Sequence, residues 1–502
     1  MLDVTFTINR QFAMAQYAYV VARNTRVGIQ TEIDKAHVEG GGLVFLPRGR
    51  YRLDGPLRLS SNVHLTGVGA QSVLEIDPAI GPAAVDVNVI ELVGGDEAAP
   101  HDIEISKLTI RGPGVRPDIT EEVSTDFKKG CGIVAAQTEV GRIAVQACRI
   151  ENTSGCGILF FTQQPDQVME GITIRDCYFL QNRRPPESGK PGLYKDLLFF
   201  GAHFENVCVE GNVCAFAPTA STAYGNDSGI AFVGNGHGGS ARHVRLVGNV
   251  CTGHRRHGLI TNYGKMEADG VFVSNNRCDN NGWVGVYVNT DTSFTQNGRV
   301  VISGNTCCHN GFGTAGGPDA ADATIRGGIV LNGAYHAVVS GNICMDNGTP
   351  GPAFVAQEAA VGAAAVHASG IRVRGRENLI DGNLVKGNAG DGIALWPGPA
   401  SRMSMTNNRA VHNGRHGLLV AGTKAKEARQ VIVAGNVCAA NGENGLRSYF
   451  TDGALVASNY IGDNDKAGVD LASNARRVRL EANFMEAKMG RRAVDDAASK
   501  RW

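Results

Sequence analysis

Residues 248–251 read Gly-Asn-Val-Cys, and this phrase or a close variant recurs between residues 211 and 485. Other clear copies are Gly211-Asn212-Val213-Cys214, Asn275-Asn276-Arg277-Cys278, Gly304-Asn305-Thr306-Cys307, Gly341-Asn342-Ile343-Cys344 and Gly435-Asn436-Val437-Cys438. Looser copies lie at 382–385, 407–410, 458–461 and 482–485, and successive asparagines in the series stand 23 to 41 residues apart. The shortest spacings are similar and the others are longer by variable amounts, which indicates one repeating unit that carries loops of different length.

Each phrase lies between two short apolar segments. An alternating run such as Val244-Arg245-Leu246-Val247 precedes it, and a glycine with an apolar run such as Gly285-Val286-Tyr287 follows it. Alternation with period two predicts strands. One repeat therefore holds about three strands, too few to bury a face alone, and stacking of repeats roughly 4.8 Å apart would complete the hydrogen bonds and the core. The predicted fold is all-β, a right-handed parallel β-helix over residues 43–488.

The asparagine and the cysteine of the phrase have structural interpretations. Asparagine tolerates left-handed backbone, and its amide can bond the asparagine one coil away, so an asparagine ladder needs no function to explain it. The cysteine is predicted to face inward as a small apolar side chain without a disulfide partner. Of the adjacent pair Cys307 and Cys308, one thiol should point in and the other out.

Both ends of the solenoid need a cover, because an open sheet edge exposes unpaired backbone groups. Residues 26–39 place Ile29, Ile33 and Ala36 on one helical face before Gly40-Gly41-Gly42 ends the pattern. We expect a cap over residues 1–42 that contains this helix. The polar residues 489–502 are predicted to form a helix-prone tail over the other end.

Composition narrows the function classes. The 502 residues carry 48 Lys and Arg against 48 Asp and Glu, so no overall field attracts nucleic acid. No run approaches the about 18 to 20 apolar residues that span a bilayer, so no membrane partner is expected. The 12 cysteines are expected to be reduced, and the first residues do not resemble a signal peptide. The expected location is the cytoplasm, or outside the cell if a signal peptide has been removed.

The helix followed by GGGLVFLPRGRYRLDGPLRLSSNVHLTGVG at residues 40–69 resembles the opening segment of the pectate-lyase-like superfamily of right-handed parallel β-helix proteins. This resemblance covers nearly the whole chain and implies a carbohydrate substrate, and a homo-oligomer such as a trimer is compatible with it. It does not specify a reaction. The Asp-Pro-His signature of mannuronan epimerases is absent, and Gly236-His237-Gly238 lacks the companion motifs of polygalacturonases.

In that superfamily the active site lies on the outer face of one stacked strand, which corresponds here to the Gly-Ile series. The charged and titratable residues just before or within this series are the candidates for a site. They are Asp126, Lys128, Lys195, Asp196, Asp227, His254, Arg255, Arg256, His257 and Tyr263. A solenoid brings such sets side by side although they are far apart in sequence.

The first functional hypothesis is proton abstraction at C5 of a uronate, as in a polysaccharide lyase or epimerase. That proton becomes acidic only when the neighbouring carboxylate is neutralised by Arg, Lys or calcium while a base removes it. Arg255 is the predicted neutralising group and His257 the acid or base. Substrate contacts are predicted for Asp126, Lys128, Lys195, His254, Arg256 and Tyr263. No cofactor is required, with calcium kept as an alternative.

Two other hypotheses stay open. A glycoside hydrolase or fructosyl-transferring enzyme needs two carboxylates about 5 to 10 Å apart, and Asp196 and Asp227 precede neighbouring strands, with Asp126 in reserve. A glycan-binding or tailspike-like solenoid needs no catalytic pair. For Arg255 and His257 we expect exposed positions, so that their substitution would affect turnover and hardly affect stability.

Overall fold

The computed structural model describes most of the chain. The described residues are 18–81, 84, 86–93, 99–113, 128–136, 139–162, 164, 166–180, 198–201, 203–215, 228–234, 239–261, 267–290, 298–312, 326–349, 368–396, 401–472, 474–486 and 494–496. They form one α-helix, α1 (Arg26–Val38), and two short 3₁₀ helices, η1 (Gly69–Gln71) and η2 (Pro78–Ile80). The remaining regular structure consists of strands in three parallel sheets.

Sheet 1 holds the strands that precede the asparagine phrase. They are β1 (Ala18–Val20), β2 (Gly42–Phe45), β5 (Val63–Thr66), β8 (His101–Ser106), β11 (Val140–Gln146), β14 (Val168–Glu170), β15 (Thr173–Arg175), β18 (His203–Glu210), β21 (Ser240–Val247), β24 (Glu267–Ser274), β27 (Gly298–Ser303), β30 (Val338–Ser340), β33 (Leu379–Asp381), β36 (Ser404–Thr406), β39 (Ala428–Ala434), β42 (Thr451–Ala457) and β45 (Arg476–Glu481).

Sheet 2 holds the strands that begin just after the phrase asparagine. They are β3 (Gly49–Leu53), β6 (Ser72–Ile76), β9 (Thr109–Arg111), β12 (Arg149–Glu151), β16 (Tyr178–Leu180), β19 (Val213–Ala215), β22 (Val250–Thr252), β25 (Arg277–Asp279), β28 (Thr306–Cys308), β31 (Ile343–Met345), β34 (Leu384–Lys386), β37 (Arg409–Val411), β40 (Val437–Ala439), β43 (Tyr460–Gly462) and β46 (Phe484–Glu486).

Sheet 3 holds the Gly-Ile strands. They are β4 (Leu57–Leu59), β7 (Ile90–Leu92), β10 (Ile133–Ala136), β13 (Ile158–Phe161), β17 (Leu198–Gly201), β20 (Ser228–Val233), β23 (His257–Thr261), β26 (Val284–Asn289), β29 (Gly327–Tyr335), β32 (Ser369–Arg376), β35 (Ile393–Leu395), β38 (Leu418–Ala421), β41 (Leu446–Tyr449), β44 (Val469–Leu471) and β47 (Val494–Asp496).

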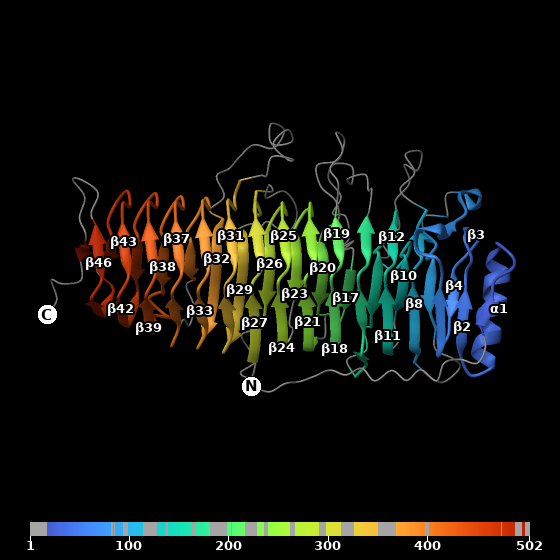
Figure 1. Ribbon diagram of the computed structural model, residues 1–502. Helices are drawn as coiled ribbons and strands as arrows, with labels where there is room; N and C mark the ends of the chain where they lie inside the picture. The colour runs from blue at the N-terminus through green and yellow to red at the C-terminus, as the bar shows by residue number, and fades with distance from the viewer. Residues whose placement is uncertain are drawn as a thin grey trace.

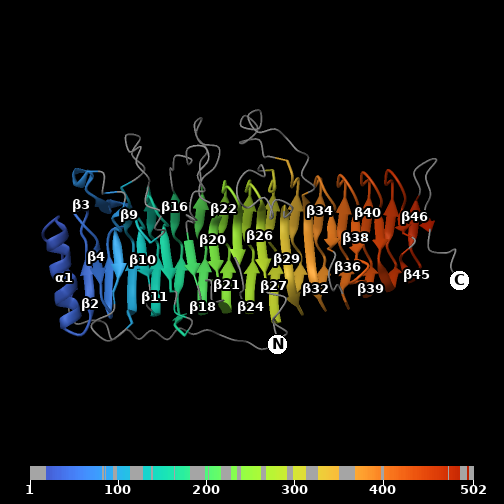
Figure 2. The same ribbon diagram turned by 180° about the vertical axis from the view of Figure 1, so that it is seen from behind.

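The chain winds through sheets 1, 2 and 3 in turn, and each coil adds a strand to the same three sheets. In Figure 1 the colour runs from blue beside α1 to red at the far end without turning back, and Figure 2 shows the same order from behind. Neighbouring strands are parallel, as in the pairing of Leu259 with Val286 and of Val286 with Ile329. The predicted right-handed parallel β-helix is confirmed.

Alternate residues of the strands point into a continuous apolar interior. The phrase cysteines Cys214, Cys251, Cys278, Cys307 and Cys344 stack there in neighbouring coils, fully buried and without disulfides. Burial raises the pKa of the Cys278 thiol well above its ordinary value. Cys308 lies on the opposite face of its strand from Cys307 and outside the main core. The inward, unbridged cysteines predicted from the phrase are confirmed.

Two asparagine ladders close the turns on either side of sheet 2. In the first, the Asn249 side chain donates to the carbonyl of Val209 and to Oδ1 of Asn276, at 2.9 and 3.0 Å. The backbone N–H of Asn249 also donates to Asn276 Oδ1, at 2.9 Å. The second ladder runs from Asn281 to Asn464 with the same pattern. Each buried amide is thereby satisfied by the next coil, which fixes the register of the stack.

The N-terminal end of the stack is covered by α1. Thr25 caps the helix, its Oγ1 accepting from the N–H of Gly28 at 3.2 Å. Ile29, Ile33 and Ala36 are fully buried, so the predicted helix and its apolar face are confirmed. Of the tail expected over residues 489–502, residues 494–496 form β47, which pairs with β44 in sheet 3, and the other residues lie outside the described part of the chain. The backbone groups at the end of sheet 3 draw this segment into a strand despite its helical propensity.

None of the described helices has the length and apolarity that crossing a bilayer requires.

Candidate active site

Three consecutive coils place large side chains at one position, immediately before a strand of sheet 3. Arg256 precedes β23, Trp283 precedes β26 and Arg326 precedes β29. The strands pair with His257 opposite Val284 and Val284 opposite Gly327, so the three preceding residues stack across the turns. The backbone agrees, because the N–H of Trp283 donates to the carbonyl of Arg256 at 2.7 Å. We call Arg256, His257, Trp283, Tyr287 and Arg326 the Trp283 cluster.

The indole ring of Trp283 lies between two guanidinium groups. The Arg256 guanidinium carbon lies 4.9 Å from the ring centroid, and that of Arg326 lies 4.8 Å from it. Arg326 is only 1% exposed and donates from Nη1 to the carbonyl of Gly282 at 2.9 Å. An aromatic ring attracts cations to both of its faces, and the attraction grows when water is excluded. The result is two buried positive charges beside one aromatic ring.

His257 and Tyr287 lie beside this pair. The His257 ring centroid is 5.5 Å from that of Trp283 and 5.2 Å from that of Tyr287. Burial, followed by the charges of Arg256 and Arg326, holds the pKa of His257 well below its ordinary value. Its Nδ1 is buried and has no hydrogen-bond partner among the residues that the structure describes. The imidazole is therefore neutral at pH 7 and can accept a proton.

The outer face of sheet 3 changes character around this cluster. Toward the N-terminus its outward residues are apolar and buried, among them Val134, Leu159, Ala231 and Ile260. Two coils beyond Tyr287 the outward residue is Arg372, whose guanidinium carbon lies 3.3 Å from the ring centroid of Trp396. Burial lowers the pKa of Arg372 to about 10, and the side chain remains cationic at neutral pH. In this outward row Arg372 is a single cationic residue, with Val330 before it and Ala394 after it.

The segment 254–257 corrects one expectation. Its side chains do not all face solvent, because His254, Arg256 and His257 are buried and Arg255 is half-buried. His254 is fully buried inside the coil, where its Nε2 donates to the carbonyl of Cys214 at 3.0 Å. Burial lowers the pKa of His254 to about 4. A substrate contact for His254 does not fit this position, and His257 is buried where an exposed position was expected.

The other predicted site residues divide into two groups. Lys128 precedes β10, four strands from β23 in sheet 3, and its Nζ lies 5.8 Å from the Phe161 ring centroid. It is not part of the Trp283 cluster. The remaining predicted residues lie outside the described part of the chain, and they are Asp126, Lys195, Asp196, Asp227 and Tyr263. Their roles, and that of Arg255, stay predictions.

The sequence interpretation missed Trp283, Tyr287, Arg326 and Arg372. A signal for three of them was present. Trp283 and Arg326 stand at the same offset before their Gly-Val and Gly-Ile strands as Arg256 before Gly258-Leu259, and Tyr287 follows Gly285-Val286. Aligning the coils on the glycine would have placed Trp283 and Arg326 in one column with Arg256, and Tyr287 four positions further along the coil.

Among the described residues, no group of three or more His, Cys, Asp or Glu side chains is arranged to hold a metal ion.

Comparisons with known proteins agree with the architecture. The family described as "Right handed beta helix region" matches residues 363–485. Alginate lyase 7 of Azotobacter vinelandii is 32% identical over 186 residues, which is 36% of this chain and 19% of that protein. Mannuronan C5-epimerase AlgE3 of the same organism is 28% identical over 222 residues, 41% of this chain and 11% of that protein. The matches thus span about a fifth or less of these two relatives.

Solved structures of low sequence identity resemble the chain over much of its length. The A-module of mannuronan C-5 epimerase AlgE4 from Azotobacter vinelandii is 14% identical, with 94% of this chain and 93% of that chain covered and a TM-score of 0.34. The Dettilon tailspike protein gp208 is 14% identical, with 76% of this chain and 63% of that chain covered and a TM-score of 0.49.

Proposed function

We propose that this chain, whose fold is the right-handed parallel β-helix of the pectate-lyase-like superfamily, acts on a uronate-containing polysaccharide by removing the proton at C5. The observation that carries the proposal is the Trp283 cluster, in which a neutral histidine and a tyrosine lie beside two buried arginines. The sequence similarity to alginate lyase 7 and to mannuronan C5-epimerases supports this substrate class.

The arginines supply the first requirement of the reaction. The negative charge of a uronate carboxylate opposes the build-up of further negative charge at C5. If Arg256 and Arg326 bind and neutralise this carboxylate, the electrons left at C5 can delocalise into it. Arginine suits this role because its planar fork binds a carboxylate through two parallel hydrogen bonds. Burial is the main cause of the low pKa of His257, and the arginine charges add to it. A bound carboxylate would offset these charges and make His257 a stronger base when substrate is present.

His257 then takes the C5 proton, and the Tyr287 ring centroid lies 5.2 Å from that of the imidazole. If Tyr287 gives its proton to the glycosidic oxygen at C4, the C4–O bond breaks and a 4,5-unsaturated uronate results. If Tyr287 instead delivers its proton to the opposite face of C5, the bond stays intact and the sugar is epimerised. Both routes use the same base and the same carboxylate contacts, and they differ in where the second proton goes.

The test is a set of incubations with polymannuronate and polyguluronate in D₂O. A lyase produces ultraviolet absorbance from the unsaturated sugar, whereas an epimerase places deuterium at C5 without absorbance. Reducing ends without either signal would contradict the proposal and favour the hydrolase hypothesis with Asp196 and Asp227. The absence of any product would favour a non-catalytic solenoid.

Addition of a chelator tests the role given to the arginines. If Arg256 and Arg326 neutralise the carboxylate, turnover should be unchanged when calcium is removed. Loss of activity that is restored by calcium would assign the neutralisation to a cation and contradict this part of the proposal.

A further inference from the structure

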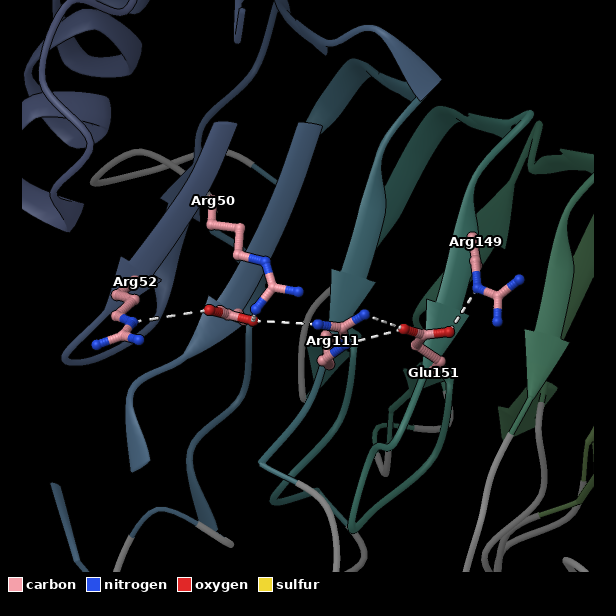
Figure 3. Close-up of polar contacts among 6 residues, drawn as sticks. Arg50, Arg52, Arg111, Arg149 and Glu151 are labelled. Atoms are coloured by element: carbon pink, nitrogen blue, oxygen red, sulfur yellow. Dashed lines mark hydrogen bonds and ion pairs between the residues drawn. The ribbon is translucent and has the colours of Figure 1, made fainter. Parts of the chain in front are cut away.

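A second charged surface lies on the outer face of sheet 2, near the N-terminal end and on a different sheet from the Trp283 cluster. Four successive strands, β3, β6, β9 and β12, present its side chains in register. Figure 3 shows them as a row across these strands. We call Arg50, Arg52, Glu75, Arg111, Arg149 and Glu151 the arginine ladder.

The ladder alternates positive and negative groups. Arg111 donates to Glu151 from Nε and Nη2 at 2.8 and 2.6 Å, and from Nη1 to Glu75 at 3.2 Å. Arg149 also donates to Glu151. Arg50 and Arg52 approach Glu75 only at 4.0 and 3.8 Å, the outer limit of an ion pair.

The two signs of charge differ in depth. The Glu75 and Glu151 side chains are 11% and 7% exposed, whereas those of Arg50 and Arg52 are 67% and 66% exposed. The carboxylates therefore lie at the base of the ladder, where they fix Arg111. The guanidinium groups face solvent, and four arginines against two glutamates leave a net positive surface.

The charge of the ladder ends at β12. On the next three strands of sheet 2 the outward residues are uncharged: Tyr178, Leu180, Val213, Ala215, Val250 and Thr252. Tyr178 is partly exposed, and the guanidinium carbon of Arg149 lies 5.2 Å from its ring centroid. The exposed arginines span three coil steps, which is roughly 14 Å at 4.8 Å per coil. Neighbouring arginines of the ladder lie one or two coil steps apart, within the Debye length of about 8 to 10 Å, so adjacent charges act together on a polyanion.

Stability alone does not account for Arg50 and Arg52. Exposed ion pairs contribute little, and pairs at these distances contribute less. Arg111 and Arg149 already satisfy the two carboxylates by hydrogen bonds. Two further exposed arginines over the same carboxylate add positive charge to the surface with no matching acid.

We propose that the arginine ladder is a secondary binding surface for an anionic, uronate-type polysaccharide chain, separate from the reaction site on sheet 3. The inference rests on the proposed function for the identity of the polymer. Carboxylates are the anions that guanidinium forks bind best in pairs, and the partly exposed ring of Tyr178 offers a face on which a sugar can stack. Binding on this second face would hold a long polymer on the protein while another stretch of it occupies the groove of sheet 3.

The experiment measures dissociation constants by affinity electrophoresis of the full chain in gels that contain polymannuronate. Every sample carries the Tyr287→Phe substitution so that the polymer is not consumed. The test variant is Arg50→Gln with Arg52→Gln, because neither side chain is buried. The control is Arg409→Gln, an exposed arginine in the same outward row on β37. We expect affinity to fall about tenfold in the double variant, to stay unchanged in the control and to weaken with added salt.

Two outcomes would overturn the proposal. One is equal affinity of the double variant and the Arg409→Gln control for polymannuronate. The other is equally tight binding of duplex DNA through the same arginines, which would make the ladder a surface for any polyanion. The proposed function is tested separately by product formation. Polymer that is bound through the ladder and never converted would refute the reaction and leave the ladder standing, and conversion without an effect of the double variant would do the reverse.

Discussion

At the scale of single residues, His254 shows how a histidine can serve as a structural element. It stands where later coils have asparagine, and its Nε2 bonds the carbonyl of Cys214 as Asn281 bonds that of Cys251. The backbone N–H of His254 donates to Asn281 Oδ1 at 3.1 Å, so His254 occupies the position before Asn281 in the second ladder. His416 is also fully buried, and its Nε2 lies 3.2 Å from Glu443.

These buried histidines predict acid sensitivity of folding. Burial lowers the pKa of His254 and of His416 to about 4, against about 6.5 in the unfolded chain. The folded form stays neutral while the unfolded form binds protons, so stability is complete above pH 6.5 and is lost as the pH falls toward 4.

His254→Asn should remove part of this dependence, because asparagine can donate to the same carbonyl. We expect the variant to gain about 2 to 3 kcal/mol relative to the wild type between pH 7 and pH 4.5, measured by urea unfolding at both pH values. His412→Asn is the control, since His412 is exposed and has a left-handed backbone that asparagine tolerates. The same pH dependence in the His254→Asn variant and the wild type would contradict the explanation.

Tyr287 allows a direct test of the proposed acid. Tyr287→Phe removes only the hydroxyl, so turnover should fall by roughly 10² to 10⁴ while the free energy of unfolding changes little. Tyr460→Phe serves as the control, because Tyr460 lies on sheet 2 and its hydroxyl bonds Glu486. Initial rates on polymannuronate and polyguluronate give the answer. Full activity of Tyr287→Phe would exclude the hydroxyl from proton transfer.

At the scale of elements, α1 is the part that completes the N-terminal end of the stack. Its buried face packs against β2, β4 and β5, and its opposite face is polar or exposed. The helix therefore replaces the coil that would otherwise cover the apolar interior. Most of its stability comes from this packing, because an isolated helix of 13 residues is marginal in water.

Substitutions on the two faces of α1 should differ accordingly. Ile33→Ala removes a fully buried side chain and should cost about 2 to 4 kcal/mol, whereas Val27→Ala changes a residue that is 61% exposed and should cost little. Urea unfolding followed by circular dichroism measures both. Equal effects of the two variants would mean that the helix does not seal the core.

At the scale of the whole molecule, stacking protects side chains that no single coil could bury. None of the twelve cysteines, all of which lie in the described part of the chain, forms a disulfide, and Cys208 is the one among them that is only partly buried. Thiol reagents require both access and the thiolate form. In the folded protein the coils above and below a buried cysteine block access of the reagent, and burial disfavours the thiolate.

Cys208 should consequently react first with a thiol reagent, although burial and Glu210 raise its pKa and slow the reaction. The other eleven thiols should react only on unfolding, and the total should be the same with and without reductant. Cys208→Ser should abolish the early phase, whereas Cys308→Ser should retain it. More than one rapidly reacting thiol in the native protein would show that the coils open separately.

The sequence was sufficient for the architecture because its repeats are local. Each sequence pattern consists of residues that are close together in the chain. The Asn phrase corresponds to a turn, the Gly-Ile series to strands, and the face formed by Ile29 and Ile33 to a helix. Alternation within a strand also decides which side chain points inward, so Cys307 and Cys308 could be assigned correctly.

The candidate site was decided by the tertiary structure. Arg256, Trp283 and Arg326 are 27 and 43 residues apart in sequence and meet only because loops of unequal length return to the same register. The turn before each sheet 3 strand has no alternation from which inward and outward could be read, so His254 was expected at the surface and lies in the interior. A repeat in the sequence determines how the coils stack, because the positions of turns and inward apolar residues within one repeat decide which backbone groups pair and which side chains are buried. Contacts between side chains of different coils depend on the register of the stack, which only the folded molecule defines.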